Sequence, residues 1–205
     1  MSITFPLLSG AAGAAAGWLV SRIVDAATRD RNRRTRRLEA VLATAAAATF
    51  LAILAVKLKE PGPRLFVYGG LILALIGVTV FDIRTQLIPH AVTIPGTIAG
   101  LILGSLVLPR GIPESVLGLV VGGGVLLAAT IVEALRKKEI GGGDWKYAAM
   151  IGSFIGPQRI VVALVLTGVF GAVGAAVIAL SGNHARPHAL GPWLSAGAVA
   201  SILLG

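Results

Sequence analysis

LFVYGGLILALIGVTVFD, residues 65–82, decides the fold class, because residues 65–81 carry no charge and the run then ends at an aspartate. As an α-helix this run approaches the roughly 30 Å thickness of a bilayer's hydrocarbon core. The rest of the chain is similar, with 56% hydrophobic and 13% charged residues and a mean hydropathy of +0.87. Soluble domains contain roughly 45–50% apolar residues. The sequence therefore predicts an all-α, polytopic membrane protein.

Charged and Pro/Gly-rich breaks divide the chain into eight apolar runs, which predict eight transmembrane helices. The run 144–156 would be only about 20 Å long as a helix. It is either a half-helix that stops at Pro157 or a crossing at a thin place in the membrane. The runs are 5–24, 38–56, 65–81, 91–109, 115–135, 144–156, 160–180 and 189–205.

The net charge of +9 favours lipid headgroups over nucleic acid, because the basic residues lie in short segments between apolar runs. If the N-terminus is external, 13 of the 18 lysine and arginine residues fall on one side. Such a bias is typical of the cytoplasmic face. We expect one integral membrane domain over residues 1–205, with 25–37 as a short basic cytoplasmic loop, surrounded by lipid and without a nucleic-acid partner.

Glycines recur at four-residue spacing in four of the predicted helices. Small residues at this spacing let helix backbones approach closely inside a membrane. We therefore predict close helix packing at these positions and assign them no chemistry. The pairs are Gly13/Gly17, Gly100/Gly104, Gly118/Gly122 and Gly152/Gly156.

Two of the nine acidic residues stand apart from the others. Asp82 ends the run 65–81 and Asp144 opens the run 144–156, so the predicted topology brings both to the cytoplasmic edge of the membrane. An acid at membrane depth is costly unless it is paired or has a function. The structural alternatives are a helix N-cap for Asp144 and an ion pair with Arg84 for Asp82. We expect the other acids to be solvated or paired.

Two carboxyl groups in one partly desolvated site share a proton near neutral pH, which supplies an acid and a base together. The ionised group takes a proton from water as the water attacks a peptide carbonyl, and the protonated group donates to the carbonyl oxygen. This chemistry needs no thiol, and the chain has no cysteine. The same acids also fit a second class, a small transporter or channel component in which they relay protons or bind a cation.

Four segments of the chain resemble the type IV prepilin peptidases. FDIRTQLIPH (81–90) is similar to the family's aspartate and isoleucine-proline signature, and GGGDWKYAAMIGSFIG (141–156) is similar to its GxGD segment followed by lysine. FPLLSGAAGAAAGWLVSRIV (5–24) resembles the family's first span, and RPHALGPWLSAG (186–197) resembles the start of its last span. The resemblance implies Asp82 as one of two catalytic acids.

The resemblance further implies that Asp144 is the second catalytic acid, with Gly141 and Gly143 forming the active-site turn. The implied activity is that of an aspartic endopeptidase, which cleaves the basic leader of type IV prepilins or prepilin-like proteins at the cytoplasmic side of the inner cell membrane. Proteolysis then needs no cofactor and no metal. The family also recognises a glutamate of the substrate helix, and Lys146 and Arg84 are the candidates to contact it. A snorkelling interfacial side chain is the alternative for Lys146.

Many members of this family carry two cysteine pairs of a zinc-binding loop between their first two spans, where this chain has DAATRDRNRRTRR (25–37). N-methylation of the new N-terminus, the family's second activity, therefore stays open, and we expect S-adenosylmethionine as a cofactor only if that activity is present. We do not expect His90, His184 or His188 to bind metal, because no acidic partner is evident near them. The expected partners are prepilin or pseudopilin helices, and the oligomeric state is not assigned.

Overall fold

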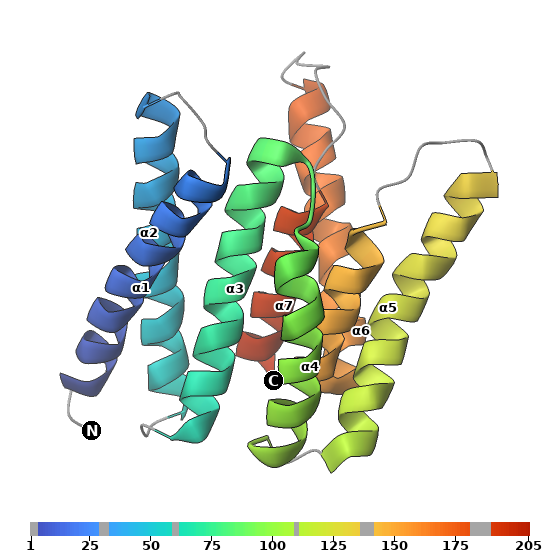
Figure 1. The fold of residues 1–205 in the computed structure, drawn as a ribbon, viewed down its shortest axis with the longest axis horizontal. Helices are drawn as coiled ribbons and strands as arrows, with labels where there is room; N and C mark the ends of the chain where they lie inside the picture. Colours follow the sequence, from blue (N-terminus) through green and yellow to red (C-terminus); the bar gives the residue numbers. More distant parts are fainter. Residues whose placement is uncertain (1–3, 29–32, 59–61, 109–110, 136–141, 181–189) are drawn as a thin grey trace. The chain divides into compact units, whose positions relative to one another are not determined.

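The computed structural model describes seven α-helices and no strand within residues 4–28, 33–58, 62–108, 111–135, 142–180 and 190–205 (Figure 1). The described chain confirms the all-α prediction. It divides into two compact units, Met1–Thr85 and Gln86–Gly205. The prediction of a single domain stays a prediction, and each unit is described by itself below.

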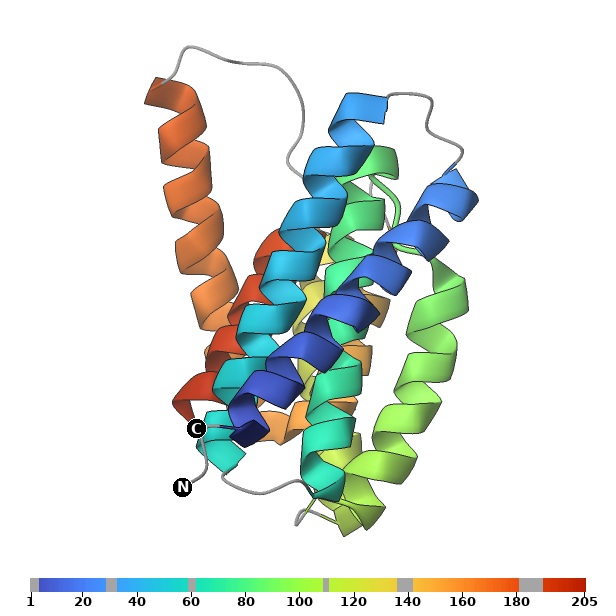
Figure 2. The ribbon, with the colours of Figure 1, turned by 90° about the vertical axis from the view of Figure 1, so that its left-hand side faces the viewer.

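The first unit contains α1 (Thr4–Thr28), α2 (Arg33–Leu58) and α3 (Pro63–Thr85), each of which packs against the other two (Figures 1 and 2). The cytoplasmic loop stays a prediction, and helical structure enters its predicted range 25–37 from both sides, since α1 continues to Thr28 and α2 begins at Arg33. The reason is that alanine and arginine, which are abundant there, are good helix formers. Only residues 29–32 of that segment lie outside the described helices.

The helices α1 and α2 meet through glycine, as the four-residue spacing predicted. A Cβ atom on Gly13 would lie 2.7 Å from the carbonyl oxygen of Ala47, and one on Gly17 would lie 2.7 Å from the Ala47 side chain. Ordinary contacts between carbon atoms are about 3.5–4.0 Å long. Any side chain at these glycines would therefore push the two helices apart.

The second unit contains α4 (His90–Leu106), α5 (Gly111–Leu135), α6 (Asp144–Leu180) and α7 (Gly191–Leu204). The helix α6 contacts the other three and forms the centre of this unit (Figure 1). Every residue from Tyr147 to Gly156 is buried. A helix that is apolar on all sides is expected at such a central position.

A break at Gly156 divides α6 into two helices. The φ and ψ angles of Gly156 are 77° and 174°, a region that is essentially restricted to glycine. In one straight helix Ala148 and Ile160 would be about 18 Å apart. A Cβ atom on Gly122 of α5 would nevertheless lie 2.5 Å from the Ala148 carbonyl oxygen and 2.9 Å from Cγ1 of Ile160. The chain therefore reverses at Gly156, and residues 144–155 form a separate helix of about 18 Å, as the short run 144–156 indicated.

The predicted glycine packing is also confirmed in the second unit. A Cβ atom on Gly118 would lie 2.8 Å from the Cα atom of Gly156, and one on Gly152 would lie 2.6 Å from the carbonyl carbon of Gly118. On α4, a Cβ atom on Gly100 would lie 2.8 Å from the Phe154 ring, and one on Gly104 would lie 2.7 Å from the Ser153 carbonyl oxygen. The helices α4 and α5 thus both pack directly on the first half of α6.

The helices α1, α2, α3, α5 and α6 are long and apolar enough to cross a membrane, while α4 and α7 are apolar but shorter. The chain is therefore a multi-pass membrane protein. The exact number of eight spans stays a prediction.

Candidate active site

Asp82 lies in the last turns of α3, where it is only 4% exposed. The helix ends three residues later at Thr85, and Gln86 follows with a positive φ of 55°. A left-handed residue directly after a helix is a common way to stop it. Asp82 is therefore held on a helix close to the point where the chain leaves the first unit.

Asp144 is the first residue of α6, and it is half-buried. The first hydrogen bond of the helix runs from the Tyr147 amide to the Gly143 carbonyl oxygen, at 3.0 Å. This bond gives Gly143 the N-cap position and Asp144 the first position inside the helix. A carboxylate in the first turn is favoured by the positive end of the helix dipole.

The segment that follows Asp82 in the sequence packs against the turn that precedes Asp144. A Cβ atom on Gly143 would lie 3.0 Å from Cβ of Ile88 and 3.6 Å from its backbone nitrogen. Ile88 itself is buried, with 8% exposed. Only glycine lets the Leu87-Ile88-Pro89 segment approach this closely. The two segments that resemble the prepilin peptidase signatures are thus in direct contact in the second unit.

Lys146 makes a second link between the same segments. Its Nζ atom lies 3.4 Å from Nε2 of His90 and 5.4 Å from the centre of the Trp145 ring. A cation at this distance is attracted by the face of an indole ring. Sequence reasoning gave His90 no role, and its place beside Lys146 depends on the contact between α4 and α6.

Arg84 is held within the first unit by two ion pairs. Its Nε atom donates to Oε2 of Glu39 at 2.5 Å, and its Nη1 atom lies 2.9 Å from Oδ1 of Asp25. Nη1 also donates to the Thr28 hydroxyl at 2.9 Å. The side chain of Arg84 is 6% exposed. Asp25 and Glu39 are therefore paired, as expected, and Arg84 joins the ends of all three helices of the first unit. Its contact with a substrate stays a prediction.

Tyr147 and Ser195 form a buried hydroxyl pair that sequence reasoning missed. The two hydroxyl oxygens are 2.7 Å apart, and the Ser195 hydroxyl also donates to the Gly191 carbonyl oxygen at 2.8 Å. Tyr147 is fully buried. A tyrosine three residues after Asp144 in an otherwise apolar helix was the available signal, because a buried phenol needs a hydrogen-bond partner.

The remaining predicted positions lie outside the described residues. Gly141, the first residue of the predicted turn, is one of them. His184 and His188 are the others, so the structure adds nothing to the prediction that they bind no metal.

The fold and these contacts define a multi-pass membrane protein with one acid near the end of α3, one at the start of α6, and the segments beside them joined by Ile88 and Gly143. The type IV leader peptidase family matches residues 69–176, which include Asp82, Asp144 and just over half of the chain. The chain belongs to this family.

Several curated relatives carry the name prepilin leader peptidase/N-methyltransferase. The one from Escherichia coli (strain K12) is 30% identical over 142 residues, which cover 67% of this chain and 61% of that protein. The one from Neisseria gonorrhoeae is 34% identical over 134 residues, covering 62% and 45% respectively. The one from Aeromonas salmonicida (strain A449) is 30% identical over 137 residues, covering 64% and 46%. This chain thus spans about half to three fifths of the length of these relatives. No solved structure matches the chain significantly.

Proposed function

We propose that this chain is an intramembrane aspartic endopeptidase that removes the basic leader of type IV prepilins or prepilin-like proteins. Its catalytic acids are Asp82 and Asp144, and Gly141 and Gly143 form the supporting turn. The contact between Ile88 and Gly143 is the observation that supports this assignment most strongly. This contact joins the segment after Asp82 to the turn before Asp144. Membership of the type IV leader peptidase family supports peptide cleavage as the reaction of these two acids.

The proposed mechanism uses only water and the two carboxyl groups. The ionised carboxylate takes a proton from water, whose oxygen attacks the peptide carbonyl carbon, while the protonated carboxyl donates its proton to the carbonyl oxygen. The first carboxyl group then passes the proton that it took from water to the leaving nitrogen, and the C–N bond breaks. The second carboxylate takes back its proton from the former carbonyl oxygen, so that the pair again holds one proton. Asp82 is buried, and burial strengthens the electrostatic interactions of its carboxyl group.

Two features of the second unit support recognition of a substrate helix. Lys146 is half-buried beside His90 and two residues from Asp144, so its ammonium group can meet an acidic side chain close to the cleavage site. The Tyr147–Ser195 hydrogen bond fixes the same turn of α6 against α7. We propose Lys146, rather than Arg84, as the contact for the substrate glutamate, because the ion pairs of Arg84 with Asp25 and Glu39 are internal to the first unit.

The proposed site lies at the cytoplasmic face of the inner membrane, as the distribution of basic residues indicates. The name of the relatives also includes N-methyltransferase, an activity that is open for this chain. S-adenosylmethionine would supply the methyl group for such a step, and proteolysis as proposed does not use it.

The experiment is leader cleavage by the purified chain in liposomes with a prepilin-like substrate, followed by mass spectrometry of the product. We expect a single cut between the basic leader and the apolar helix. A parallel sample with S-adenosylmethionine shows by mass whether the new N-terminus is methylated. A folded chain that leaves every such substrate intact but carries protons or cations across the bilayer would contradict the proposal and support a transporter.

A further inference from the structure

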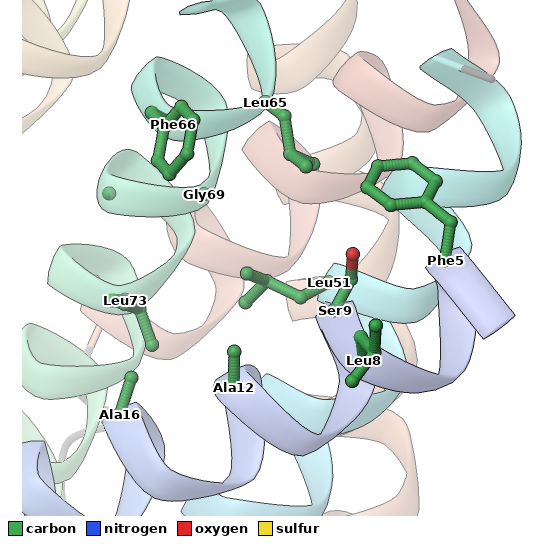
Figure 3. Close-up of a pocket in the computed structure, with 11 residues that line it drawn as sticks. Phe5, Leu8, Ser9, Ala12, Ala16, Leu51, Leu65, Phe66, Gly69 and Leu73 are labelled. Atoms are coloured by element: carbon green, nitrogen blue, oxygen red, sulfur yellow. The ribbon is translucent and has the colours of Figure 1, made fainter. Parts of the chain in front are cut away.

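An apolar groove lies on the first unit, between α1 and α3 with one side chain from α2 (Figure 3). Its volume is about 440 Å³. Small residues such as Ala12 and Gly70 make room for the groove, and larger ones such as Leu8 and Phe66 border it. Phe66 is 76% exposed and Leu8 is 69% exposed, so the groove is bordered by apolar side chains at the surface of the structure.

The lining of the groove excludes a polar ligand. Ser9 provides its single side-chain hydroxyl group, and the other lining side chains are aliphatic, aromatic or absent. A nucleoside or a charged peptide would lose its hydration there without replacement hydrogen bonds. The groove does not fit S-adenosylmethionine for the same reason. Its occupant must be a hydrocarbon.

The length of the groove matches one leaflet of a bilayer. Its lining on α1 runs from Phe5 to Ala16, a rise of about 16 Å. One leaflet contributes about 15 Å to the hydrocarbon core, whereas a transmembrane helix needs about 30 Å. A single acyl chain therefore fits the groove better than a substrate helix or a second copy of the chain does.

Positive charge lies at one end of the groove. Arg64 is exposed and directly precedes Leu65 and Phe66, which line the groove at the start of α3. Lys57 is exposed in the last turn of α2, the helix that precedes α3 in the sequence. The positive end of the α3 dipole adds to this field. Basic residues next to a membrane span attract anionic headgroups by about 1 kcal/mol each.

We propose that this groove binds one acyl chain of an anionic phospholipid, with the phosphate beside Arg64. The lipid belongs to the leaflet at the opposite end of α3 from Asp82, so the site is separate from the proposed catalytic acids and does not depend on the proposed activity.

The test uses nanodiscs of equal phosphatidylglycerol and phosphatidylcholine, and native mass spectrometry of the released protein with its retained lipids. Gly70→Leu adds a large side chain to the lining of the groove, and a Cβ atom at Gly70 meets nothing within 4 Å. Gly124→Leu on α5 is the matched control, because Gly124 is also exposed and a Cβ atom there also meets nothing within 4 Å. Arg64→Gln removes the positive charge and does not change the residues that line the groove.

We expect Gly70→Leu to retain one phospholipid fewer per chain than the wild type, and Gly124→Leu to retain the same number. Arg64→Gln should lower the preference for phosphatidylglycerol about fivefold, the factor for one basic residue at a lipid surface. Equal lipid retention by Gly70→Leu and Gly124→Leu would overturn the proposal. A photoreactive derivative in place of Phe66 that cross-links to a substrate helix or a second copy, and not to phospholipid, would also overturn it.

Discussion

Alanine at Gly143 tests whether the close contact with Ile88 matters for activity. A Cβ atom there would lie 3.0 Å from Cβ of Ile88, whereas carbon atoms prefer about 3.5–4.0 Å. The turn before Asp144 or the segment around Ile88 must then move by a few tenths of an ångström. A displacement of about 1 Å at a catalytic group can reduce the rate about 100-fold. The smaller shift at Gly143 should cost less, and we therefore expect Gly143→Ala to cleave substrate up to about tenfold more slowly.

The neighbouring residue provides the control. A Cβ atom on Gly142 would have Trp145 Nε1 as its nearest neighbour, at an ordinary distance of 3.8 Å. Among the described glycines only Gly111 and Gly156 have positive φ, so alanine causes no backbone strain at either tested position. The assay is the initial rate of leader removal in liposomes at matched protein levels, with the unfolding temperature measured in parallel. Equal loss in Gly142→Ala and Gly143→Ala, or normal rates in both, would refute the reasoning.

Three further substitutions test other parts of the structure. Gly122→Ala should be less stable than Gly124→Ala by about 1–3 kcal/mol, the usual cost of overpacking. Both variants gain the same helix propensity, but of the two glycines only Gly122 faces α6, so equal stability in denaturant titrations would contradict the packing. Arg84→Gln should lower the free energy of unfolding by about 2 kcal/mol, between the values for exposed and buried ion pairs. Adding Glu39→Gln should recover part of this loss, and additive effects of the two substitutions would show that the pair is not coupled. Lys146→Gln should raise KM about tenfold with kcat unchanged. With a substrate that has glutamine in place of its helix glutamate, the wild type and Lys146→Gln should have the same KM. An unchanged KM for the normal substrate would exclude the contact.

The helices and their close contacts could be predicted from the sequence, because both depend on local patterns. Uninterrupted apolar runs predicted every helix of the described chain, and α1, α2, α3 and α5 extend their runs by a few residues into the flanks. The four glycine pairs predicted close packing that the structure contains. In lipid, a helix needs only apolar length, and small residues mark the face where another backbone approaches.

The side-chain partners could not be predicted in the same way, since they depend on which helices are neighbours. Arg84 pairs with Asp25 and Glu39, which lie on two other helices and far from it in the sequence. The sequence indicated a stop near Pro157, but the reversal itself depends on the backbone angles of Gly156. Both features depend on packing within a unit, and no repeating pattern in the sequence indicates them.

The most direct test of the central claim is leader cleavage by Asp82→Asn and Asp144→Asn in membranes. Glu114→Gln is the matched control, because Glu114 is an exposed acid in the first turn of α5, as Asp144 is an acid in the first turn of α6. All variants should be folded and equally abundant. We predict that both aspartate variants lose cleavage while Glu114→Gln cleaves at the wild-type rate. Near-normal cleavage by either aspartate variant would contradict the two-carboxyl mechanism.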